Sequence, residues 1–141
     1  MTRRNLTVAL HWSIVFLILA MVKGGTSERW VLALFAVFVA LWGAMTLILG
    51  LMGRPGPKLS PPLRRAYPWM HRSLHILLAL TAIAVVFRLI GRPLPWLDAW
   101  TMLLVTLSAG TFHGVFHFWR HTALYDNALR LITPRFMHNI L

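Results

Sequence analysis

The chain alternates long apolar runs with shorter polar segments. Four runs carry few charged residues, and they cover residues 6–22, 30–52, 69–90 and 96–119. A helix of about 20 mostly apolar residues is long enough to cross the hydrocarbon core of a bilayer. The pattern therefore predicts an all-α fold, an integral membrane four-helix bundle in which residues 1–141 form a single membrane domain.

Two polar segments are longer than simple turns. Residues 53–68 hold five prolines and four basic residues, and proline at this density predicts an extended basic loop. Residues 122–141 follow the last run and predict a polar, amphipathic tail. Within it, Asp126 and Asn127 are expected to cap a short helix, because Asp and Asn side chains accept hydrogen bonds from the first turn.

Composition supports the membrane assignment and gives it an orientation. Hydrophobic residues make up 58% of the chain and charged residues 12%, whereas a soluble domain is about a quarter charged. The net charge of +11 comes from basic residues between the apolar runs, which favours lipid headgroups over nucleic acid as the partner. Most of them fall on one side of the bilayer, which places both termini in the cytoplasm. These are Arg3, Arg4, Arg54, Lys58, Arg64, Arg65, Arg72, Arg120, Arg130 and Arg135.

The residue types that are scarce exclude several chemistries. The sequence has no cysteine, which excludes disulfides, iron–sulfur centres and thioether-attached haem. Its only carboxylate side chains are Glu28, Asp98 and Asp126, which disfavours a di-iron site and carboxylate acid–base catalysis. Any metal chemistry must therefore use mainly histidine or methionine.

Histidines are the candidate functional residues. His113, His117 and His121 are four residues apart and share one side of the last helix. With both termini in the cytoplasm, His11, His75 and His113 all lie about 8–11 Å below the cytoplasmic boundary, at 1.5 Å per residue. Imidazoles on facing helices can ligate a haem iron from both sides. Arginines at the same face are candidate partners for the haem propionates: Arg3, Arg4, Arg72 and Arg120.

Two segments resemble bacterial cytochrome b561. Residues 113–134 read HGVFHFWRHTALYDNALRLITP, which is similar to the C-terminal signature of that family. Residues 6–12 read LTVALHW, which resembles the family's opening Leu-His-Trp. The Pro-rich loop and the run that contains His75 extend the resemblance to about three of the four spans.

The resemblance implies a four-helix cytochrome of the bacterial inner membrane that binds haem b and exchanges electrons with quinone. Family positions match His11 and His113 as the axial iron ligands of the cytoplasmic-side haem. The outer haem of the family has no counterpart, because the second run lacks histidine and Ala99 occupies the other ligand position. One haem is therefore expected.

Alternatives remain open for the other histidines. His75 is expected to ligate iron or to contact a propionate or quinone, and His117 could form a second haem site with His71 or His75. His71, His121 and His138 otherwise read as headgroup contacts, and the tryptophans as interfacial anchors.

The function also has alternatives. The chain could act by itself or as a homodimer, either as a quinone-linked oxidoreductase or as an electron-transfer protein. It could instead be an accessory or anchoring subunit of a larger respiratory or photosynthetic complex, with or without haem. A third possibility is a transporter or sensor that uses the histidines as a proton relay, although the spans offer no acidic partners.

Overall fold

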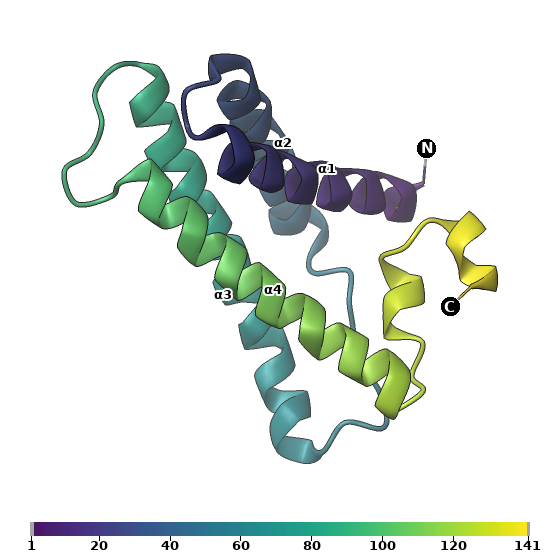
Figure 1. The fold of residues 1–141 in the computed structure, drawn as a ribbon. Coiled ribbons are helices and arrows are strands. Elements are labelled where there is room, and N and C mark those ends of the chain that lie inside the picture. The colour runs from purple at the N-terminus through teal and green to yellow at the C-terminus, as the bar shows by residue number, and fades with distance from the viewer. Residues whose placement is uncertain (1, 141) are drawn as a thin grey trace.

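The computed structural model describes residues 2–140, and Met1 and Leu141 lie outside the described part. Four helices dominate it: α1 (Arg3–Gly24), α2 (Arg29–Leu49), α3 (Pro61–Leu89) and α4 (Ala99–Ala123). All four are long and apolar enough to cross a membrane. The all-α four-helix prediction is confirmed, and each predicted span corresponds to one helix. Figure 1 shows the start of α1 near the tail, and Arg4 contacts His138; we call this end of the bundle the terminal end.

Helix boundaries follow local capping chemistry. Thr2 precedes α1, and its hydroxyl accepts a hydrogen bond from the Asn5 amide at 3.3 Å. Asp98 precedes α4, and its carboxylate accepts from the Thr101 amide at 2.8 Å. These contacts satisfy amides that have no acceptor inside the helix. Gly25 follows α1 with a φ of 71°, a conformation that favours glycine and lets the chain leave the helix sharply.

The Pro-rich segment differs from its prediction. Residues 53–68 were expected to be an extended loop throughout, but α3 already begins at Pro61, and that prediction is wrong for residues 61–68. Pro61 and Pro62 occupy the first two helical positions, where an amide needs no acceptor within the helix. Pro68 lies inside the helix and removes one backbone hydrogen bond. The helix therefore extends eight residues further toward the terminal end than the apolar run.

Apolar packing closes the half of the bundle away from the terminal end. Ile14 and Met21 of α1, Phe35 of α2, Val85 of α3 and Leu103 of α4 are almost fully buried in one cluster. Helix α2 packs against α1 and α3, and α3 packs against α4, whereas α1 and α4, which close the ring of four helices, are packed more loosely than these three neighbouring pairs. The looser packing of α1 against α4 leaves space between them toward the terminal end.

The tail folds back over that space. It contains two short 3-10 helices, η1 (Ala128–Leu131), where a short helix was expected after Asp126 and Asn127, and η2 (Arg135–Asn139). Asp126 caps η1 as expected, because its Oδ1 accepts from the Ala128 amide at 3.0 Å, while the Asn127 side chain makes no capping bond. Trp12 Nε1 donates to the Ile132 carbonyl at 2.9 Å and ties the tail to α1.

Candidate cofactor site

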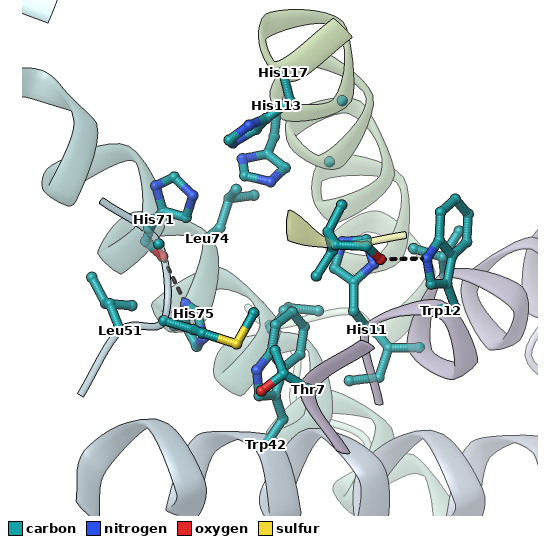
Figure 2. Close-up of a pocket in the computed structure, with 18 of the residues that line it drawn as sticks. Thr7, His11, Trp12, Trp42, Leu51, His71, Leu74, His75, His113 and His117 are labelled. Carbon is teal, nitrogen blue, oxygen red and sulfur yellow. Dashed lines mark hydrogen bonds between the residues drawn. The ribbon is translucent and has the colours of Figure 1, made fainter. Parts of the chain in front are cut away.

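A cavity of about 440 Å³ occupies the terminal end of the bundle. All four helices and η1 contribute to its walls, and most of its lining is apolar. Its size falls within the range of small-molecule and cofactor sites, about 300–1,000 Å³. Five of the chain's seven histidines line it, and Figure 2 shows them around the space: His11, His71, His75, His113 and His117.

Helix α4 presents its histidines on an open wall. His113 and His117 are one turn apart and line the cavity on the same side of the helix. Gly110 and Gly114 line the cavity beside them, and a Cβ added at either glycine would meet no atom within 4 Å. The wall between the imidazoles is therefore free of side chains, which leaves room for a flat ring.

Helix α3 fixes the tautomers of its two histidines. Nδ1 of His71 donates to the Tyr67 carbonyl at 2.9 Å, and Nδ1 of His75 donates to the His71 carbonyl at 2.8 Å. A carbonyl can only accept, so each Nε2 keeps its lone pair. The Nε2 of His75 then accepts from the Thr46 hydroxyl at 3.3 Å, whereas within residues 2–140 the Nε2 of His71 has no such bond. His71 is thus the better prepared of the two to bind a metal.

Three imidazoles from α3 and α4 form a tight group, which we call the histidine cluster: His71, His113 and His117. One ligand atom from each lies within 4.8 Å of the other two. The ring of His71 meets those of His113 and His117 edge-on, with centroids 4.9 and 5.5 Å apart. The three rings therefore contact one another directly, and their ligand atoms lie near enough together to be candidates for one shared ion.

His11 enters the cavity from α1. Its ring packs edge-on against Trp12 and Trp42, with centroids 5.5 and 5.6 Å away. Its Nδ1 is buried and has no hydrogen-bond partner among the described residues, and the same holds for Nδ1 of His113 and Nε2 of His117. An unsatisfied buried polar atom costs about 1–3 kcal/mol. Three such atoms line one cavity, and neutral imidazoles with free lone pairs are residues that could hold a metal or a haem iron.

The assignment of His11 and His113 as the axial pair stays a prediction. Both side chains line the same cavity from different helices, as that assignment requires. His71 also lies close enough to His113 to compete with His11 as its partner.

The arginines are placed differently from one another. Of the four expected propionate partners, only Arg3 lines the cavity, and its Nη2 donates to the Gly50 carbonyl at 2.6 Å. Arg4 instead binds tail carbonyls of Arg130 and Thr133 at 2.9 and 2.8 Å. Arg72 is exposed and stacks over the Trp69 ring at 5.3 Å, away from the cavity lining.

Arg120 is buried, with a carboxylate partner from the protein itself. Its Nη2 and Nε contact Oδ2 of Asp126 at 2.6 and 2.7 Å, and both side chains are 1% exposed. The guanidinium lies over the Tyr67 ring at 5.1 Å, and a side chain at Gly56 would overlap the ion pair. Arg120 therefore anchors the start of the tail to α4 and lies outside the cavity lining.

From the sequence, His71 was expected mainly as a headgroup contact, and Tyr67 was not among the candidate residues. The apolar run begins at residue 69, which placed His71 at the membrane surface, but α3 begins at Pro61 and carries His71 in its third turn. The spacing of His71 and His75 repeats that of His113 and His117, and this i, i+4 match is the signal that could have paired the helices.

Comparison of the chain with protein-family models, with curated proteins and with solved structures gives no match. The cytochrome b561 resemblance therefore rests on the sequence segments alone.

Proposed function

We propose that this protein is a membrane-embedded b-type cytochrome that carries one haem ligated by His11 and His113 and exchanges electrons with quinone. The observation that carries the proposal is the cavity at the terminal end, lined by five histidines of which three have buried, unpartnered nitrogens. The quinone part of the proposal rests on the family resemblance of residues 6–12 and 113–134.

The residues around the cavity suit this role. Haem b, when bound, supplies a one-electron redox centre. His11 and His113 would supply the two imidazoles that ligate the iron, and Trp12 and Trp42 pack on the His11 ring and restrict its rotation. Most of the cavity lining is apolar and comes from all four helices, as is typical of a cofactor site. Arg3, at the edge of the cavity, is placed to pair with a propionate.

The proposal also assigns the side of the membrane that the terminal end faces and the partners of the protein. The terminal end carries most of the basic residues, so it faces the cytoplasm of a bacterial inner membrane. His75 and His117, which are not iron ligands in this scheme, are left for contacts with a propionate or quinone. Native mass spectrometry in mild detergent separates a monomer or homodimer with quinone-linked activity from an accessory subunit that copurifies with a larger redox complex.

The test is a reduced-minus-oxidised absorption spectrum of the purified protein, with haem counted per chain. We expect one b-type haem, which is lost in His11→Ala and in His113→Ala. His138→Ala is the matched control, because His138 lies in the tail, next to Arg4, and outside the cavity lining. Absence of haem from protein made in haem-replete cells, or an unchanged spectrum in both ligand variants, would refute the proposal. If His71→Ala loses haem and His11→Ala retains it, the second iron ligand beside His113 is His71 and not His11.

A further inference from the structure

The histidine cluster has the composition of a metal site. It offers three imidazoles from two helices, with ligand atoms within 4.8 Å of one another. A tetrahedral ion with bonds of 2.0–2.1 Å needs ligand nitrogens about 3.4 Å apart. Rotation of the imidazoles can close the difference, because α3 and α4 already pack together and two of the rings are on one helix face.

The donors are available for coordination. A metal needs a neutral imidazole with a free lone pair, and a hydrogen bond from the other ring nitrogen usually sets that tautomer. His71 meets this condition through its bond to the Tyr67 carbonyl. His113 and His117 each have a buried nitrogen without a partner, so coordination would satisfy atoms that are otherwise costly to bury.

The donor set also selects the class of ion. Three imidazoles without a thiolate or a free carboxylate suit a transition metal of borderline softness and do not suit Mg²⁺ or Ca²⁺, which prefer oxygen ligands. The carboxylate of Asp126 is already paired with Arg120, and the pair adds no net charge near the cluster.

We propose that His71, His113 and His117 bind one divalent transition-metal ion of the Zn²⁺ class, and that this ion and haem exclude each other. The metal site needs only the histidine cluster, whereas the exclusion rests on the proposed function. His113 belongs to both sites, and its ligating nitrogen can serve one centre at a time. His11 belongs only to the haem site, while His71 and His117 belong only to the metal site.

The experiment uses full-length protein from haem-deficient cells in mild detergent, with Zn²⁺ measured by competition against a chromophoric chelator. We expect one Zn²⁺ per chain, and Co²⁺ in its place should give the visible bands of a four-coordinate site. His71→Ala and His117→Ala should each weaken binding at least tenfold, and His11→Ala and His138→Ala should leave it within twofold. Circular dichroism has to show parental helix content in every variant; a variant that fails is replaced by its Gln counterpart, which also lacks a metal-binding imidazole.

The results separate this site from the proposed haem site. Absence of Zn²⁺ binding in the parent chain, or binding that persists in both His71 and His117 variants, overturns the metal site even where haem is found. Equal Zn²⁺ affinity in haem-loaded and haem-free protein overturns the exclusion. Loss of haem with normal Zn²⁺ binding in His11→Ala would support both assignments.

Discussion

The buried ion pair between Arg120 and Asp126 permits a quantitative prediction. Both side chains are 1% exposed, and two guanidinium nitrogens share one carboxylate oxygen at 2.6 and 2.7 Å. At an effective dielectric constant of 20, charges at this distance attract by about 6 kcal/mol before desolvation is counted. Asp126→Leu removes this attraction and leaves the Arg120 charge buried alone, which typically costs about 3–5 kcal/mol.

The same carboxylate holds the tail, which adds to the cost. Oδ1 of Asp126 accepts from the Ala128 amide at 3.0 Å, and a hydrogen bond of this kind contributes about 0.5–1.5 kcal/mol. We therefore expect Asp126→Leu to lower the free energy of unfolding by about 4–6 kcal/mol in total. The double variant Arg120→Met, Asp126→Leu should recover part of the loss, because no uncompensated charge remains.

Unfolding in mixed detergent micelles of increasing sodium dodecyl sulfate content, followed by circular dichroism at 222 nm, measures these values. Glu28→Gln is the control, since Glu28 is an exposed carboxylate without a side-chain cap bond and its removal should change stability by less than about 0.5 kcal/mol. An Asp126→Leu effect below about 1 kcal/mol, the value typical of a solvated pair, would refute the reasoning.

Three further predictions concern other contacts. Trp12→Phe removes the indole donor to the tail carbonyl, so stability should fall by about 0.5–1.5 kcal/mol and limited proteolysis should cut the tail faster. The hydrogen bond from the Thr101 backbone amide, helped by that from the Thr101 hydroxyl, holds the pKa of Asp98 below its usual value. Its capping contribution is therefore present at neutral pH and is lost as pH falls through that lowered pKa, so Asp98→Asn should show a weaker acid dependence of melting temperature. Thr81→Val should cost about 1–3 kcal/mol, because the buried hydroxyl of Thr106, 2.6 Å away, loses its partner, whereas changing both to Val should cost less in the same unfolding assay.

The number and type of the helices were predictable because each apolar run had to satisfy its own backbone in a membrane. The start of α3 was not, since proline was taken as a helix breaker although Pro61 and Pro62 fit the first turn. Depth alone predicted that His11, His75 and His113 lie in one layer, and all three line the same cavity. Depth does not fix rotation about a helix axis, so it could not show that His71 joins His113.

The role of Arg120 shows a second limit. A cation next to the membrane surface has many potential partners. From the sequence alone, a haem propionate and a carboxylate of the chain were equally possible partners for Arg120. The structure pairs it with Asp126, six residues away. That choice depends on how the chain turns after α4, where Tyr125 and Asn127 take positive φ values of 51° and 57°. Neither turn could be read from the hydrophobic pattern.

The tail places a constraint on the order of assembly. Residues 125–133 include the segment that closes the cavity, and they leave the ribosome after all four helices have been made. Until Trp12 and Arg4 have captured that segment, the cavity is open at the terminal end. A chain that stops after α4 would retain every cavity-lining imidazole and yet leave them open to water and to exchange. The tail therefore adds its part of the cavity wall only after the four helices have supplied theirs.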